Sequence, residues 1–121
     1  MSFIPLIILL GQAGFSFLFF DTPTIHQQCG VQVKVGYAIA GCYQKSQKQV
    51  LLNTDYSWHW KYTIPHEYAH HVTLNNPIFY REIWTYFDDE EQMADAYAEY
   101  WNDRDGYTER EPQKAEWFKK F

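Results

Sequence analysis

The sequence predicts an α+β domain in which a three-stranded, mostly antiparallel sheet packs on two helices. Residues 31–52 contain short apolar or alternating stretches separated by turns, as in an antiparallel meander. Residues 63–74 and 88–101 have the length and boundary residues of helices. The chain has 121 residues, enough for one core, and its 20% of aromatic residues help a small domain to fill that core.

The N-terminal segment differs from the single domain that we expect over 21–121. Residues 3–20 carry no charge, and their length is near that of a bilayer span. Three interpretations stay open: a signal peptide, an anchor that gives membrane attachment through residues 3–20, or a buried element broken at 11–14. No Lys or Arg precedes Lys34, so the usual positive flank is missing. Localisation therefore stays open, and so does whether Met1 is the natural start.

The predicted sheet follows a polar connector at 21–30. Residues 31–39 begin with a clean apolar–polar alternation and form the first expected strand. A second strand is expected over 40–43 and a third over 49–52, joined by a polar turn. Gly41 lacks a side chain, which suits a bulge or the close approach of another backbone.

Two cysteines, Cys29 and Cys42, are too few for a disulfide scaffold. In an exported protein they could bridge two neighbouring strands. In a cytosolic protein they would be buried thiols. The sequence leaves both alternatives open.

A proline complicates the start of the first helix. Pro65 is tolerated in a first turn, whereas inside a helix it removes a hydrogen bond and costs about 3 kcal/mol. We therefore expect Thr63 to cap a helix that ends near Leu74, before Asn75-Asn76-Pro77. A longer helix from Ser57, kinked at the proline, is the alternative.

Three further segments follow this helix. Residues 78–87 are rich in aromatic side chains and predict a short helix. Asp88 can cap the next helix, which we expect to end near Trp101, before a turn at 102–106. Thr108 and Glu111 have the spacing of a capping box, so a last helix is expected over 112–119.

His66-Glu67-Tyr68-Ala69-His70 is the stretch that predicts chemistry. Histidines four residues apart lie on one face of a helix, about one turn from each other, so both imidazoles can reach one metal ion. Glu67 lies beside the first histidine and is placed to act on a metal-bound water. This is the HExxH pattern of zinc peptidases.

A second acidic motif lies twenty-one residues further along the chain. Glu91 could supply the third protein ligand, and Asp95 lies four residues on, on the same helical face. Asp95 could accept a hydrogen bond from the far nitrogen of a ligating histidine and so orient the ring. The alternative is that Glu91 only completes a capping box with Asp88. Glu90 and Glu99 are weaker candidate ligands.

HExxH followed by Glu91-x-x-Ala94-Asp95 resembles the gluzincin clan of zinc metallopeptidases, and the chain is most similar to the minimal members of that clan. The resemblance covers about residues 31–102. It implies a small zincin-like fold, with a helix that carries the histidines and another that carries the glutamate. It also implies an edge strand near 36–42 that binds extended peptide.

The same resemblance implies a role for each site residue. His66, His70 and Glu91 would bind Zn²⁺, Glu67 would be the general base, and Asp95 would orient a ligand. The substrate would be a peptide or protein, and the activity that of a zinc metalloendopeptidase. Candidates for stabilising the oxyanion of the reaction are four further residues: Tyr37, His71, Tyr97 and Tyr107.

Two rival interpretations remain. A deformylase-like hydrolase also uses HExxH, but takes its third ligand from an upstream cysteine, here Cys42. A non-catalytic metal-binding module, or a latent peptidase-like protein, would keep the metal without turnover.

Charge and the remaining histidines add little to this picture. The net charge is −5 and no basic run is present, which argues against nucleic acid as a partner. His71 is expected to be a cleft or packing residue, because it lies about 100° around the helix from His70. His26 and His59 belong to no motif and are expected at the surface.

Overall fold

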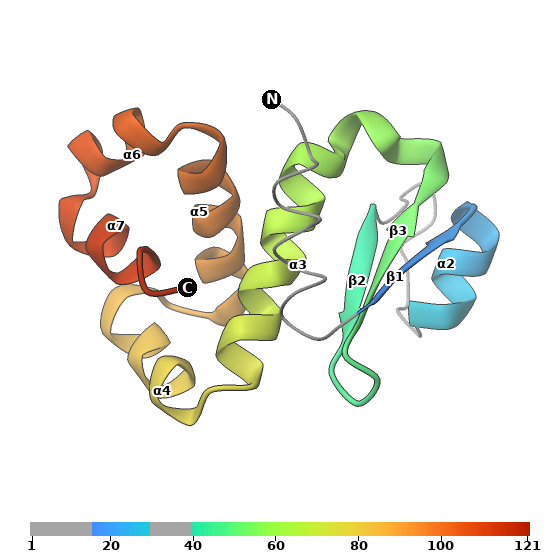
Figure 1. Cartoon of the computed structure of the whole chain (residues 1–121), viewed down its shortest axis with the longest axis horizontal. Coiled ribbons are helices and arrows are strands. Elements are labelled where there is room, and N and C mark those ends of the chain that lie inside the picture. Colours follow the sequence, from blue (N-terminus) through green and yellow to red (C-terminus); the bar gives the residue numbers. More distant parts are fainter. Residues whose placement is uncertain (1–15, 30–39) are drawn as a thin grey trace.

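A sheet between two layers of helices forms one half of the molecule, and the C-terminal helices form the other half (Figure 1). The computed structural model describes residues 16–29 and 40–121. One face of the sheet is covered by α2 (Thr22–Cys29) and the other by α3 (Trp60–Leu74). Beyond α3 lie α4 (Pro77–Tyr86), α5 (Glu90–Asn102), α6 (Arg104–Arg110) and α7 (Pro112–Phe118). Within the described ranges the fold is thus α+β, with a three-stranded sheet and six α-helices, as the sequence predicts.

The sheet is mixed, with strand order β1–β3–β2. The central strand β3 (Gln49–Asn53) pairs antiparallel with β2 (Gly41–Gln44) and parallel with β1 (Ser16–Phe20). The strands predicted at 40–43 and 49–52 are confirmed, while the one predicted at 31–39 lies outside the described residues. The prediction of a mostly antiparallel sheet is wrong for the β1–β3 pair, which is parallel. A parallel pairing joins segments far apart in the chain, and no local turn marks it.

Part of the apolar N-terminal segment belongs to the sheet. Residues 16–20 form the edge strand β1, whose Phe19 side chain lies half exposed and contacts the Trp60 ring at a centroid distance of 5.4 Å. Residues 3–15 lie outside the described residues. Across the described ranges, no helix combines the length and the apolar character needed to cross a bilayer.

A disulfide joins the outer helix to the sheet. Cys29, the last residue of α2, is bonded to Cys42 of β2, with the two Cα atoms 6.2 Å apart. This spacing suits a disulfide. The bridge therefore exists, but it links a helix to a strand instead of two strands.

Helix α3 begins earlier than the proline suggests. It runs from Trp60, so Pro65 lies in its interior, and the prediction that Thr63 caps the helix is wrong. The alternative of a longer helix is nearer the structure, because a 3₁₀ turn, η1 (Thr54–His59), precedes α3.

Another helix compensates for the proline. Pro65 has no N–H to donate to the carbonyl of Lys61, four residues earlier. The side-chain amide of Asn102, at the end of α5, donates to that carbonyl at 2.8 Å and to the Ala98 carbonyl at 2.8 Å. A tertiary hydrogen bond thus replaces the lost helical one and ties α5 to α3.

Gly41 allows β2 to lie close to α3. A Cβ atom at this position would be 2.5 Å from the Leu51 carbonyl oxygen and 2.9 Å from Cγ2 of Thr63. Real Cβ atoms do not approach other atoms so closely, so glycine is needed here for steric reasons. The expected close approach at Gly41 is confirmed, and it brings the edge strand against the histidine helix.

The C-terminal part contains one more helix than predicted. The helices expected at 78–87 and 112–119 are confirmed as α4 and α7. The turn expected at 102–106 is instead the start of α6, whose N-cap Asp103 accepts a hydrogen bond from the Gly106 amide. Thr108 caps nothing, since it lies inside α6 and its hydroxyl donates to the Arg104 carbonyl.

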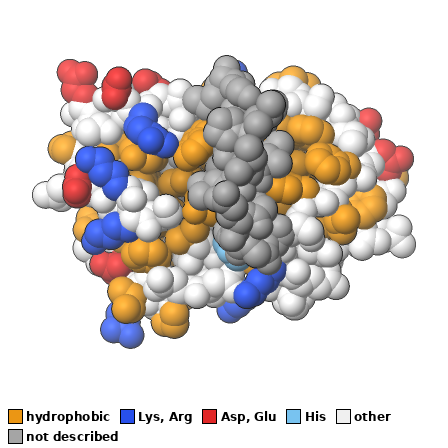
Figure 2. Space-filling model, in the orientation of Figure 1, with side chains coloured by type: hydrophobic (Ala, Val, Ile, Leu, Met, Phe, Trp, Pro, Cys, Tyr) orange, Lys and Arg blue, Asp and Glu red, His pale blue; other side chains and the backbone are white. Residues whose placement is uncertain are grey.

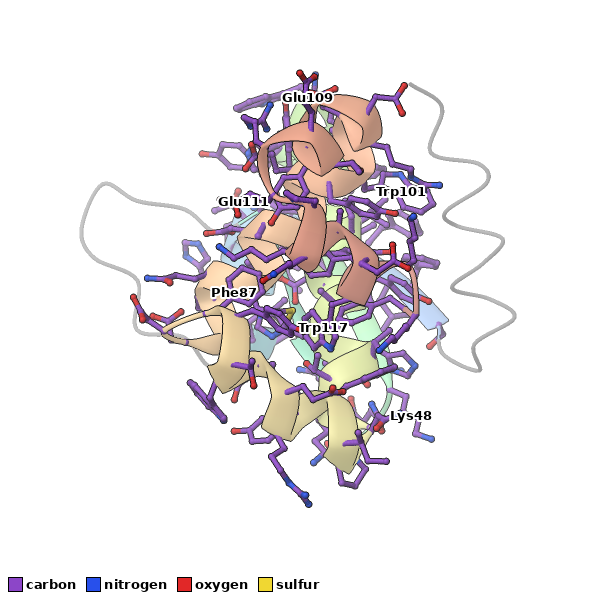
Figure 3. The ribbon with its side chains drawn as sticks, turned by 90° about the vertical axis from the view of Figure 1, so that its left-hand side faces the viewer. Lys48, Phe87, Trp101, Glu109, Glu111 and Trp117 are labelled. Carbon is purple, nitrogen blue, oxygen red and sulfur yellow. A yellow bond between two sulfur atoms is a disulfide. The ribbon has the colours of Figure 1, made fainter. Side chains whose placement is uncertain are left out.

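The C-terminal helices close a dense aromatic core. Trp117 and Phe118 are 2% and 1% exposed, and Trp117 packs against Phe87 as seen in Figure 3. Tyr97 and Tyr100 of α5 contact Phe118 from the other side. On the face shown in Figure 2, basic and acidic side chains are mixed over this C-terminal part.

Candidate metal centre

Helix α3 places the two motif histidines on one face. His66 and His70 are one turn apart, and their Nε2 atoms lie 3.3 Å from each other. Their ring centroids are 4.9 Å apart. The two rings are mostly buried, with 18% and 11% of their side-chain surface exposed. Both nitrogens therefore face one small volume, as the four-residue spacing predicts.

Helix α5 brings the glutamate to the same volume. Glu91 Oε1 lies 2.8 Å from Nε2 of His70, and Oε2 lies 3.2 Å from Nε2 of His66. Most of the Glu91 side chain, 70%, is exposed, so the third side of the site is open to solvent. These three residues form a group that could hold a metal ion, with ligand atoms within 4.8 Å of one another.

The capping of α5 leaves Glu91 available. The N-cap is Asp89, not Asp88, and its carboxylate accepts from the Gln92 amide at 2.7 Å. The side-chain oxygen of Gln92 in turn accepts a hydrogen bond from the Asp88 amide at 3.3 Å. The alternative in which Glu91 only completes a capping box is therefore wrong, because Gln92 occupies the capping position.

The distances fit a tetrahedral metal site. Zinc bonds to nitrogen and oxygen of 2.0–2.1 Å give a tetrahedron with edges of about 3.3 Å. The 3.3 Å between the two imidazole nitrogens equals that edge, and the two oxygens of Glu91 lie 3.2 Å from His66 Nε2 and 2.8 Å from His70 Nε2. Nitrogen and carboxylate ligands in this number are also the donor set of catalytic zinc. The residues present therefore fit such an ion.

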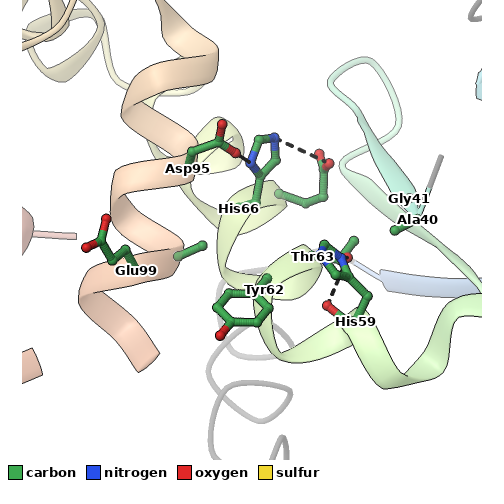
Figure 4. Close-up of a pocket in the computed structure, with 10 residues that line it drawn as sticks. Ala40, Gly41, His59, Tyr62, Thr63, His66, Asp95 and Glu99 are labelled. Carbon is green, nitrogen blue, oxygen red and sulfur yellow. Dashed lines mark hydrogen bonds and ion pairs between the residues drawn. The ribbon is translucent and has the colours of Figure 1, made fainter. Parts of the chain in front are cut away.

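Asp95 orients one imidazole. Its Oδ1 lies 2.8 Å from Nδ1 of His66. Figure 4 shows the Asp95 carboxylate facing that ring. An ionised carboxylate only accepts, so Nδ1 carries a proton, and Nε2 is the nitrogen that faces the site, where a proton or a metal ion can be held. Glu91 and Asp95 are four residues apart on α5, so one helical face supplies both groups.

Glu67 lies beside the three candidate ligands and not among them. Its Oε1 is 3.9 Å from Nε2 of His66, and only 8% of its side chain is exposed. Burial raises the pKa of Glu67, although the two histidines oppose this shift. A carboxylate with a raised pKa takes and returns protons nearer neutral pH.

The field of the site favours a cation. Burial alone would lower the pKa of His66, yet the hydrogen bond to Glu91 and the charges of Glu67, Glu91 and Asp95 raise it to about 9. Hydrogen bonds from His66 and His70 hold the pKa of Glu91 well below its usual range. The lone pairs of His66, His70 and Glu91 point at one volume and repel one another unless a proton or a metal ion lies between them. Protons and a metal ion therefore compete for this position.

Two hollows meet at this centre. The first, here the N-terminal pocket, lies at the start of α3 and has a volume of about 510 Å³. The second, the metal cavity, measures about 470 Å³ and extends toward the end of α3. Gly41, His66 and Glu67 line both. The candidate centre therefore lies in the middle of a cleft along β2 and α3.

Sequence reasoning missed His59. It was expected at the surface, but it lines the N-terminal pocket, where its Nδ1 lies 3.0 Å from Thr63 Oγ1 (Figure 4). His59 precedes His66 by seven residues, which is two helical turns on one face. That spacing could have indicated it, had the helix been expected to begin before Thr63.

His71 joins β2 to α3. Its Nδ1 lies 2.7 Å from the hydroxyl of Tyr43, and the Asn75 amide donates to that hydroxyl at 3.0 Å. His71 is thus a packing residue at the sheet–helix contact, as expected. Tyr43 also lines the metal cavity, and the sequence did not single it out.

The other candidate groups are not part of the three-residue ligand group. Tyr97 and Tyr107, two candidates for stabilising an oxyanion, are each 3% exposed and lie in the aromatic core, while Tyr37 is outside the described residues. Glu99 pairs with Arg110, and Glu90 hydrogen-bonds Tyr80.

Cys42 is not placed to bind the same ion. It is bonded to Cys29, and successive side chains of a strand point to opposite faces. Its neighbour Tyr43 faces α3, where it meets His71, and Gln44 reaches the Gln28 carbonyl of α2. Cys42 borders the metal cavity, but its sulfur is held in the disulfide, which removes the thiolate ligand that a deformylase-like enzyme would need.

Comparisons of the chain with models of protein families, with curated proteins and with solved structures found no match. The site itself must therefore support any functional conclusion. The site contains a His–His–Glu group on two helices that could hold a metal ion.

Proposed function

We propose that the protein is a zinc-dependent peptidase of the gluzincin type. The observation that carries this proposal is the convergence of His66, His70 and Glu91 on one volume, with a buried carboxylate, Glu67, beside it. In the described part of the chain this ligand group has three members. Structural zinc sites usually have four protein ligands, whereas catalytic sites have three and leave one position open.

Zinc suits the donor set better than other common metals. Two imidazoles and one carboxylate are typical of catalytic zinc, while calcium and magnesium prefer oxygen ligands alone. When bound, zinc would polarise a substrate carbonyl and lower the pKa of a water to about 7.

Glu67 is the proposed general base. Its burial raises its pKa, and it faces the cleft from the same helix as the histidines. It takes a proton from the attacking water and passes that proton to the nitrogen that leaves. Such acid–base catalysis typically contributes about 10²–10⁴ in rate.

Asp95 is a positioning residue. By holding the Nδ1 proton of His66, it keeps that ring in the tautomer and orientation that point Nε2 at the site. The open, exposed side of Glu91 gives a substrate access to the same volume.

The proposed substrate is an extended peptide. The edge strand β2 borders both hollows, with Gly41 at their junction. Peptides commonly add to such strand edges through main-chain hydrogen bonds. The resemblance to gluzincins supports the same orientation of substrate along β2.

Metal content and a single substitution test the proposal. Purified protein is expected to hold about one zinc per chain by elemental analysis. Glu67→Gln is expected to keep that zinc and to slow hydrolysis of a fluorescently labelled unfolded protein by about 10²–10⁴-fold. Glu116→Gln, an exposed change on α7, is the matched control and should cleave like the parent.

Two results would contradict this function. If Glu67→Gln cleaves as fast as the parent, the proposed base is wrong. If the parent holds zinc but cleaves nothing, the protein is a metal-binding module without peptidase activity.

A further inference from the structure

A third hollow continues the cleft at its other end. It measures about 520 Å³ and is lined by Lys45, Thr73, Leu74, Pro77, Tyr80, Arg81 and Trp84; we call it the basic groove. Leu74 also lines the metal cavity, and Tyr80 of the groove hydrogen-bonds Glu90 of that cavity. The two hollows are therefore neighbours, and a substrate that crosses the metal centre can extend into the groove.

The groove is basic on an otherwise acidic protein. The net charge of the chain is −5, yet Lys45 and Arg81 line this one hollow from the β2–β3 hairpin and from α4. Neither side chain makes an ion pair within residues 16–29 and 40–121. Both are exposed and so can meet a carboxylate of another molecule.

The groove also offers apolar contact to the part of a bound molecule that carries the carboxylate. Tyr80 and Trp84 are 36% and 51% exposed, and their rings meet edge to face at 6.2 Å. Pro77, Tyr80, Arg81 and Trp84 recur at the spacing of one face of α4, so one helix presents apolar contact and positive charge together.

We propose that the basic groove binds an acidic side chain of the peptide substrate. This inference rests on the proposed function, because it concerns the same cleft. Leu74 lies one turn, about 6 Å, beyond His70 along α3. An extended peptide advances about 3.3 Å per residue, so the groove begins about two residues from the bond that is cleaved, and the preferred Asp or Glu lies about two to three residues from it.

Profiling of cleavage sites tests the preference. The parent is incubated with a complex mixture of peptides, and mass spectrometry identifies the bonds that it cleaves. Asp and Glu should be enriched about two to three residues from those bonds, on one side only. The variant K45Q/R81Q should lose this enrichment while it cleaves peptides without acidic residues at the parent rate. K119Q/K120Q removes the same charge just after α7 and should keep the enrichment.

A binding measurement separates the groove from the catalytic proposal. The probes are two labelled peptides, acetylated and amidated at their ends, one Glu/Ala and one Gln/Ala in sequence. Fluorescence anisotropy with zinc-loaded parent and Glu67→Gln should show the Glu peptide bound about fivefold tighter at low salt. K45Q/R81Q should abolish that difference, and K119Q/K120Q should not.

The two proposals fail in different ways. Tighter binding of the Glu peptide that depends on Lys45 and Arg81, without any cleavage, overturns the peptidase and supports the groove. Cleavage without an acidic preference, or a preference that survives in K45Q/R81Q, overturns the groove and leaves the peptidase intact.

Discussion

The two halves of the molecule bury different chemistry. Helix α3 buries polar side chains, among them Glu67, His70, His71 and Thr73, and it contains a proline in its interior. The C-terminal core around Trp117 buries aromatic rings that contact one another. Apolar burial stabilises a fold without partners, whereas a buried carboxylate or imidazole costs free energy unless it is paired.

This contrast indicates that the two halves have different roles. The aromatic core contributes the stability, and the polar α3–α5 contact holds the groups that could bind metal. We therefore expect changes in the core to lower the free energy of unfolding, and changes at the centre to alter metal affinity and catalysis.

The largest effect is expected in the aromatic core. Trp117→Ala should lower the free energy of unfolding by about 3–5 kcal/mol, because it removes a buried ring and leaves a cavity. Chemical denaturation followed by circular dichroism measures this loss. Zinc affinity of the fraction that remains folded should stay unchanged.

A smaller substitution at the same position sharpens the test. The indole N–H of Trp117 is buried and has no hydrogen-bond partner in the described part of the chain. Trp117→Phe removes that unpaired donor and keeps a ring, so it should cost clearly less than Trp117→Ala. Equal losses for both variants would contradict the view that ring packing, and not the N–H, stabilises this core.

At the metal centre the expected effect is on affinity. Glu91→Ala removes one of the three candidate ligands and should weaken zinc binding by at least about 100-fold. Asp88→Ala, an acidic change three residues earlier and just outside α5, is the control and should bind zinc within about threefold of the parent. Titration against a competing chelator measures both. Similar losses for both variants would show that general negative charge, and not ligation, attracts the metal.

The pH dependence of zinc binding is the smallest expected effect. Because the carboxylates raise the pKa of His66 to about 9, the metal-free site carries a proton at neutral pH. Zinc must displace that proton, so affinity should rise by up to about tenfold per pH unit below pH 9 and then level off. Chelator-buffered titrations at three pH values would show it. An affinity that does not change with pH below pH 9 would contradict a proton held on His66 in the metal-free site.

The HExxH stretch shows which predictions the sequence supports well. The spacing of His66 and His70 determines a shared helical face, because the helical period is a local property of the backbone. The strands at 40–43 and 49–52 and the helices at 78–87 and 112–119 follow from equally local patterns. Glu91 could be named as a candidate ligand for the same reason, through its fixed offset from Asp95.

The tertiary structure decided what depends on distant partners. The amide of Asn102 allows Pro65 inside α3, and Gln92 in place of Glu91 completes the cap of α5. The parallel β1–β3 pairing likewise joins segments about thirty residues apart. The sequence alone thus determined which side chains share a helix face, because that depends on local geometry. Only the folded chain decided which faces meet, because contacts across long loops are chosen by packing of the whole core.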